Sequence, residues 1–315
     1  MCFFATKSSM KIRMKRKLAV VLLICISCHI GWAAQDFVWK SGQNMKVVCD
    51  TTEAPVVKVA LDLLKRDCRS VLSGEISRSE NTGNIYVGTW GESSVLQALA
   101  ETHQLDVAQL NEHKEAFLLN VLPDGRLVVA GSDKRGTAYG VLELSRMMGV
   151  SPWEWWADAV PEKKEEFRLP AGFRKLDYPQ VAYRGIFIND EDWGLTPWSW
   201  KHYEPSERKG QIGPKTHARI FELLLRLRAN TFWPAMHECS IPFFFTEGNK
   251  EMADKYAIYL GTSHCEPMMR NTNGEWKTAG KGEYDYVHNR KNVLSFWEER
   301  VKQLRHSCLL YTSDA

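Results

Sequence analysis

The segment GIFINDEDWG places one amide, three carboxylates and a tryptophan directly after an apolar stretch. These residues are Asn189, Asp190, Glu191, Asp192 and Trp193. Adjacent carboxylates repel one another, so one of the three acids can have a raised pKa and act as a general acid or base. Side chains alternate along a strand, so only some of them can face one pocket. We therefore treat the three acids as candidate catalytic residues, with a solvated loop as the alternative.

Two later segments also end in polar residues. His237 and Glu238 follow NTFWPAM, and His264 and Glu266 lie in GTSHCEPM. Their spacing matches no zinc motif, so we expect no metal site and no cofactor. Arg270 comes next and can bind a carboxylate through two parallel hydrogen bonds. An arginine near a strand end often has a structural role instead.

The second part of the chain alternates between apolar strand-like segments and helices. AYRGIFIN, NTFWPAM and GTSHCEPM are the strand segments; KTHARIFELLLRLRAN, NKEMADKYAIYLG and NVLSFWEERVKQLR have helical periodicity. Alternation of this kind predicts parallel strands joined by crossover helices. In a (β/α)8 barrel the chemistry lies at the carboxyl ends of the strands, where these polar residues fall. We expect residues 171–306 to be the first part of such a barrel, which is incomplete.

The preceding part, residues 35–170, mixes strands and helices and predicts a small α/β domain. Thr51 or Thr52 can cap its first helix, and Pro123-Asp124-Gly125 is a hairpin turn between two strands. SDKRG stands before a second helix, where an anion could bind. The aromatic segment SPWEWWADAV is expected to pack between the two parts.

Residues 1–34 resemble a signal peptide. A basic segment precedes the apolar run Leu18–Cys28, with small residues near Ala33 and Ala34 for cleavage. The apolar run is short for a membrane span, and an uncleaved anchor is the alternative. We expect an exported protein, periplasmic or extracellular, whose first residue is Met1, Met10 or Met14.

The charge of the chain gives no indication of nucleic-acid binding, and its cysteines do not form a disulfide framework. The leader holds six basic residues and no acidic one, so the remaining chain is slightly acidic despite the overall charge of +3. That balance gives no reason to expect nucleic acid as a partner. The cysteines outside the leader are scattered, which excludes a disulfide framework, although a bridge between Cys49 and Cys68 stays open.

Four long segments carry a resemblance to a known family. They are YRGIFINDEDWGL, IGPKTHARIFELLLRLRANTFWPAMHE, GNKEMADKYAIYLGTSHCEPMMRN and the upstream GTAYGVLELSRMMGVSPWEWWADAVP. They resemble family 115 of the glycoside hydrolases, and the resemblance covers nearly the whole chain after the leader. It implies an inverting xylan α-1,2-glucuronidase that removes (4-O-methyl)glucuronic acid from glucuronoxylan. It also implies recognition of sugar hydroxyl and carboxylate groups by His237, Glu238, His264 and Glu266. Asn189, Trp193 and Arg270 are further candidates for substrate binding because of their own chemistry: hydrogen bonding, stacking on a sugar ring and pairing with a carboxylate.

The resemblance also implies a longer protein. A barrel needs eight βα units, and this sequence predicts three. An inverting enzyme needs a general acid and a general base, and we expect most of that pair on later strands. Residues 307–315, SCLLYTSDA, match nothing in the family and are expected to be a non-native end. The isolated chain is therefore expected to be inactive, and a homodimer can form through later regions.

Two other functions remain open at this level. One is a carbohydrate-binding protein without catalysis, because tryptophans beside charged residues suit sugar rings as well as protein cores. The other is a hexosaminidase-like glycosidase, in which a small α/β domain also precedes the barrel.

Overall fold

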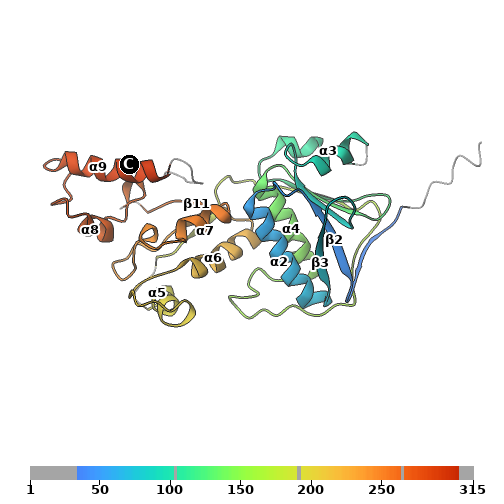
Figure 1. Cartoon of the computed structure of the whole chain (residues 1–315), viewed down its shortest axis with the longest axis horizontal. Coiled ribbons are helices and arrows are strands. Elements are labelled where there is room, and N and C mark those ends of the chain that lie inside the picture. Colours follow the sequence, from blue (N-terminus) through green and yellow to red (C-terminus); the bar gives the residue numbers. More distant parts are fainter. Residues whose placement is uncertain (1–33, 103–104, 190–192, 264–265, 305–315) are drawn as a thin grey trace, which may run out of the picture.

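A computed structural model describes residues 34–102, 105–189, 193–263 and 266–304. It confirms the predicted α/β class: a six-stranded sheet forms the first region, and three parallel strands form the second (Figure 1). Within these ranges, no helix has both the length and the hydropathy needed to cross a bilayer. The candidates Asp190, Glu191, Asp192 and His264, and the predicted leader up to residue 33, lie outside the described residues.

The first sheet has the strand order β3-β2-β4-β6-β5-β8. β3, β2, β4 and β6 are parallel, whereas β5 is antiparallel to both of its neighbours. Alternate side chains cover opposite faces: Val47 packs in the core with α2 and α4, and Val48 packs with α3 on the other face. Cys49 and Cys68 are buried and free. The strands are β2 (Asn44–Cys49), β3 (Glu75–Ser79), β4 (Ile85–Thr89), β5 (Phe117–Val121), β6 (Leu127–Gly131) and β8 (Arg174–Asp177).

The described residues of the first region form four helical segments, and a side-chain cap fixes the start of α4. Asp133 caps α4 by accepting hydrogen bonds from the N–H groups of Arg135 and Gly136, both at 2.9 Å. The helix N-terminus that SDKRG offered to an anion is thus occupied by the protein's own carboxylate. The helices are α2 (Pro55–Leu72), α3 (Ser94–Glu101), η1 (Ala108–Glu112) and α4 (Lys134–Met148).

Two local predictions in this region have different outcomes. The turn between β5 and β6 is confirmed: Gly125 has a φ of 80°, which favours glycine. The threonine cap of α2 is wrong, because the N-cap is Ala54 and makes no side-chain cap hydrogen bond. Pro55 starts the helix instead, where its missing N–H costs nothing.

The first region extends past the expected boundary at residue 170. β8 lies beyond it and pairs with β5, from Phe117 opposite Asp177 to Asn120 opposite Arg174. A separate antiparallel ribbon joins β1 (Phe37–Lys40) to β7 (Glu166–Leu169). The chain therefore leaves the first region only after Asp177.

The second region has parallel strands in the order β11-β10-β9. The third strand lies directly before GTSHCEPM, the segment expected to form it, and none of the described residues of that segment is in a strand. The predicted helix over NKEMADKYAIYLG ends at Lys255, because Ala257 has a φ of 54° and Tyr259 N–H bonds to Asn230 at 2.7 Å. The elements are β9 (Gly185–Phe187), α5 (Leu195–Trp198), η2 (Ser199–Tyr203), α6 (Pro214–Arg226), β10 (Thr231–Trp233), η3 (Phe243–Phe245), α7 (Asn249–Lys255), β11 (Tyr259–Leu260), η4 (Pro267–Met269), η5 (Thr272–Trp276), α8 (Lys277–Ala279) and α9 (Arg290–Leu304).

The two regions share one hydrophobic core. Tyr139 of α4 and Phe221 of α6 belong to the same buried cluster, and Figure 1 shows α2 and α4 facing α6 and α7. Trp155 packs against Trp198 with ring centroids 6.0 Å apart and against Tyr203 at 5.1 Å. The expected aromatic packing between the regions is confirmed.

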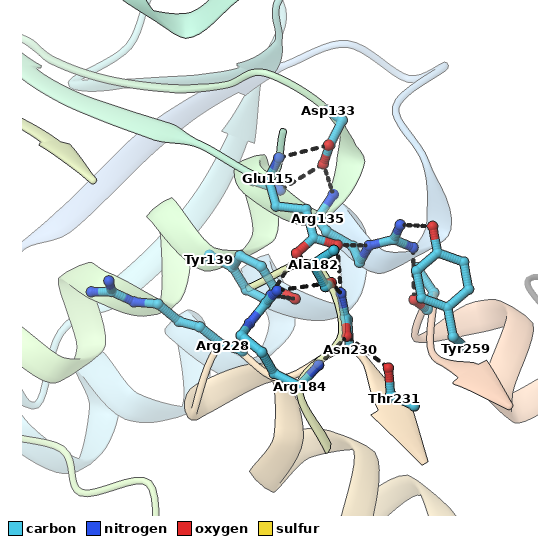
Figure 2. Close-up of polar contacts among 12 residues, drawn as sticks. Glu115, Asp133, Arg135, Tyr139, Ala182, Arg184, Arg228, Asn230, Thr231 and Tyr259 are labelled. Carbon is cyan, nitrogen blue, oxygen red and sulfur yellow. Dashed lines mark hydrogen bonds and ion pairs between the residues drawn. The ribbon is translucent and has the colours of Figure 1, made fainter. Parts of the chain in front are cut away.

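A buried polar network also joins the regions, and Glu115 is its centre (Figure 2). The Glu115 carboxylate accepts hydrogen bonds from Arg135 of α4 and Arg184 before β9. It also accepts two from the Asn230 amide before β10, at 2.8 and 3.1 Å. Arg135 continues to the carbonyl of Ala257 at 3.1 Å and to the Tyr259 hydroxyl. One carboxylate thus holds the amino ends of all three parallel strands.

We expect Glu115→Gln to destabilise the protein by about 3 kcal/mol, since it leaves the buried Arg135 and the partly exposed Arg184 without their counter-charge. Thermal melting of the full-length protein measures the loss. Glu80→Gln is the control, because Glu80 is exposed on the same region. Equal melting temperatures for the two variants would contradict a supporting role for Glu115.

Candidate functional site

The carboxyl ends of β9, β10 and β11 lie along one edge of the second sheet. Ile188 N–H bonds to the carbonyl of Trp233 at 2.9 Å, and Gly261 N–H bonds to that of Phe232 at 3.0 Å. These bonds fix where the chain leaves each strand. The segments that the sequence analysis selected follow directly, so the described candidates come from loops that start at the same edge.

Four of the described candidates are exposed. Asn189 and His237 lie at the surface, and Trp193 is 85% exposed. Glu238 forms an ion pair with Lys277 at 3.0 Å, and both side chains are largely in solvent. These side chains are accessible to solvent, and none of them is positioned by burial.

Glu266 is different, because it is only 4% exposed. Burial raises the pKa of its carboxyl to about 8, and the charge of Glu275 adds to this. A backbone hydrogen bond from Ser263 and the charge of Arg300 lower the pKa but do not outweigh burial. Glu266 therefore holds a proton at neutral pH, and its carboxylic acid can donate a hydrogen bond.

Arg270 takes a structural role instead of the predicted contact with substrate. It is 5% exposed and donates to Glu275 at 2.6 Å and to the Phe296 carbonyl at 2.8 Å. Arg300 of α9 donates to the same oxygen of Glu275, also at 2.6 Å. Arg270 was expected to bind the carboxylate of a substrate. It binds the carboxylate of Glu275 instead, because the loop after β11 folds back and brings the two residues together.

A small cavity of about 10 Å³ lies beside these groups. Pro234 and Ala235 line it from the loop after β10, and Thr262 lines it from the loop after β11. Its volume suits one water. Three apolar and three polar residues complete its wall: Phe243, Phe244, Met269, Glu266, Asn271 and Glu275.

The sequence analysis missed Asn271, Glu275 and Arg300. Asn271 bridges two loops by donating to the Met236 carbonyl at 3.3 Å and by accepting from Gly274 N–H at 3.0 Å. A signal existed for Arg300, which lies on the inward face of α9 with Val293 and Leu304. An arginine on a buried helix face implies a buried acid nearby. Trp297 and Val301 of the same helix are only half-buried.

The described ranges contain no group of three His, Cys, Asp or Glu side chains placed to hold a metal ion. The site's chemistry, as far as it is described, is that of carboxyl, amide, hydroxyl and guanidinium groups.

Comparison with known proteins identifies the family. Residues 176–313 match glycosyl hydrolase family 115. A solved structure described as a family 115 4-O-methyl-α-glucuronidase, BtGH115A, with specificity for decorated arabinogalactans is 60% identical, with a TM-score of 0.84. The chain belongs to glycosyl hydrolase family 115. The match covers 87% of the present chain and 36% of the chain of that relative, so the present chain spans about a third of the relative's length.

Two more distant solved structures also match the chain, with low sequence identity. CpGH84D is 13% identical with a TM-score of 0.48, covering 84% of this chain and 40% of its own. A β-N-acetylhexosaminidase from Bacteroides fragilis NCTC 9343 is 12% identical with a TM-score of 0.45, covering 85% and 52%. Neither likeness is strong enough to indicate function. No curated protein sequence matches the chain.

The raised pKa of Glu266 predicts a pH effect on stability. The folded state keeps a proton that the unfolded state loses above about pH 4.5, so stability falls as pH rises to about 8. The slope is at most about 1.4 kcal/mol per pH unit. We therefore expect the stabilisation of Glu266→Gln relative to wild type to grow between pH 5 and 8, measured by thermal melting.

Glu298→Gln is the matched control, since Glu298 is exposed on α9. A Glu266→Gln difference that stays flat with pH would show that Glu266 is ionised in the folded protein.

Proposed function

We propose that the protein containing this chain is a glycoside hydrolase that removes 4-O-methylglucuronic acid from a decorated polysaccharide. The 60% identity to a 4-O-methyl-α-glucuronidase of the same family carries this proposal. The described site supports it, because exposed polar and aromatic residues surround a strand edge suited to a sugar ligand.

Two polymers are candidate substrates. Decorated arabinogalactan is the first, because the similar solved structure is described as specific for it. Glucuronoxylan is the second, because the sequence resemblance implied an α-1,2-glucuronidase acting on xylan. The two polymers share the leaving sugar and differ in the chain that carries it, so the rim of the site decides between them.

Incubation of the full-length protein with each polymer separates these possibilities. We expect release of 4-O-methylglucuronic acid from arabinogalactan at least about tenfold faster than from glucuronoxylan, a difference of about 1.4 kcal/mol in transition-state binding. Chromatography of the products measures it. Faster release from xylan would assign the second polymer, and release of N-acetylhexosamine alone would contradict the proposal. Binding without any release would favour a non-catalytic carbohydrate-binding protein.

We further propose that the second region is the start of a (β/α)8 barrel and that the reaction inverts the anomeric centre. Parallel order and crossover helices support the barrel. Inversion needs one carboxylic acid and one carboxylate that activates water. Asp190, Glu191 and Asp192 remain candidates for one of these roles, and the partner is expected on a later strand.

Proton NMR during hydrolysis tests inversion. We expect the first detectable product to be the β-anomer of the released uronic acid, because water attacks the face opposite the leaving group. Early accumulation of the α-anomer would show retention and would exclude this arrangement.

A further inference from the structure

A cavity of about 180 Å³ lies in the first region, between α2 and the strands β2 and β3. One water needs about 10–15 Å³ of such space, so the cavity has room for roughly a dozen waters, about the number of non-hydrogen atoms in one hexuronic acid. β3 is the outermost strand of its sheet, so the cavity lies at the sheet's edge. The lining residues are Val47, Cys49, Lys58, Leu61, Asp62, Lys65, Ile76 and Arg78.

The floor of this cavity is apolar. Val47 and Cys49 of β2 and Ile76 of β3 are buried in the core, and each also lines the cavity. Leu61 of α2 is half-buried beside them. The floor therefore offers aliphatic surface to the C–H face of a sugar ring, which gains by leaving water.

The rim of the cavity is positively charged. Lys58, Asp62 and Lys65 follow one another at helical spacing, so they share one face of α2. Arg78 stands on β3, where one of its nitrogens donates to two backbone carbonyls at the end of β2, at 2.9 and 3.0 Å. These bonds hold the guanidinium at the rim and leave its other nitrogens as donors. Three cations and one carboxylate thus line the cavity, which leaves two positive charges in excess.

Acids close to the rim are bound elsewhere. Arg69 holds both carboxylate oxygens of Glu75, at 2.7 and 2.9 Å. The hydroxyls of Ser93 and Ser94 donate to the carboxylate of Asp50, at 2.8 and 2.9 Å. Within the described ranges, no acid forms an ion pair with the two lysines or the arginine of the rim. Their charge is therefore available to an anionic ligand.

We propose that this cavity is a second carbohydrate site, which holds a glucuronic acid residue of the polysaccharide by its carboxylate. Lys58, Lys65 and Arg78 bind the carboxylate, and the sugar ring packs on the apolar floor. A neutral sugar would leave the excess charge unmatched, so the site discriminates against it.

The inference rests on the proposed function, which supplies a polymer decorated with glucuronic acid. Figure 1 shows β2 and β3 in the first region, far from α8 and α9, which follow the candidate strand edge of the second region. A substituent held in the cavity would anchor the polymer while other substituents of the same chain reach that edge. Anchoring raises the local concentration of substrate without touching the reacting bond.

Ligand-detected NMR with the full-length protein tests the site. The probe is methyl β-glucuronoside, which carries the carboxylate on the anomer opposite to the proposed substrate and is therefore not consumed. We expect wild type to bind it about fivefold more tightly than methyl β-glucoside, the effect of a few exposed charge contacts. Raising the salt concentration to about 0.5 M should remove most of this preference.

A double variant assigns the binding to the cavity. Lys58→Gln combined with Lys65→Gln should weaken binding of methyl β-glucuronoside about fivefold, and neither lysine is buried, so the fold should persist. Lys40→Gln combined with Lys46→Gln is the matched control. It removes the same charge from exposed lysines of the first region that do not line the cavity, and it should follow wild type.

Steady-state kinetics with the decorated polymer test the anchoring. The double variant of the cavity should raise KM for the polymer about fivefold, with kcat unchanged and with KM unchanged for a short oligosaccharide that carries one glucuronic acid. Equal losses in the two double variants, or no preference for the glucuronoside in wild type, would overturn the site. Loss of glucuronoside binding with an unchanged polymer KM would overturn the anchoring and assign the cavity to free glucuronic acid.

The same measurements separate this inference from the proposed function. Binding of the glucuronoside that depends on Lys58 and Lys65, with no uronic acid released from any polymer, would refute the proposed function and keep the site. Release of uronic acid with identical binding and kinetics in the two double variants would keep the proposed function and refute the site.

Discussion

The carboxylate of Glu115 is the contact on which the arrangement of the second region depends. A buried acid is stable only when charge and hydrogen bonds compensate it, and Glu115 obtains both from segments that precede different strands. Arg184 leads into β9 and Asn230 into β10, while Arg135 continues from Glu115 to β11. The first region therefore sets where the three strands begin, and the edge that carries the candidate site follows from that placement.

The buried polar groups at the amino ends of the three strands differ from those at the carboxyl ends in how completely they are hydrogen-bonded. At the amino ends the buried polar groups satisfy one another: the Asn230 side chain donates to Glu115 and accepts from Arg184 N–H at 3.0 Å. At the carboxyl ends Glu266 is held by little more than its burial and one backbone bond among the described residues. A fully paired end stabilises the fold, whereas the loops at the opposite end carry the exposed candidate residues, a division typical of strand–helix barrels.

Ion pairs with buried acids also join the two regions. Arg226 of α6 pairs with Asp67 of α2 through two bonds of 2.9 Å, and Arg228 pairs with Glu143 of α4. Together with the shared apolar core, these pairs make the interface resemble the inside of one domain. Separation of the two regions would leave Asp67, Glu115 and Glu143 without their partners from the second region.

The sequence by itself determined most of the element types, the alternation of the second region and the family, because these depend on local periodicity and on long specific motifs. It also located the segments that follow the strands, including Glu266. Only the tertiary structure decided what each polar residue contacts. Arg270 was expected to meet a substrate carboxylate and instead meets Glu275, since that pairing depends on a loop that folds back against α9. Glu115 gave no signal in the sequence, because its partners lie far along the chain and are brought together only when the regions pack.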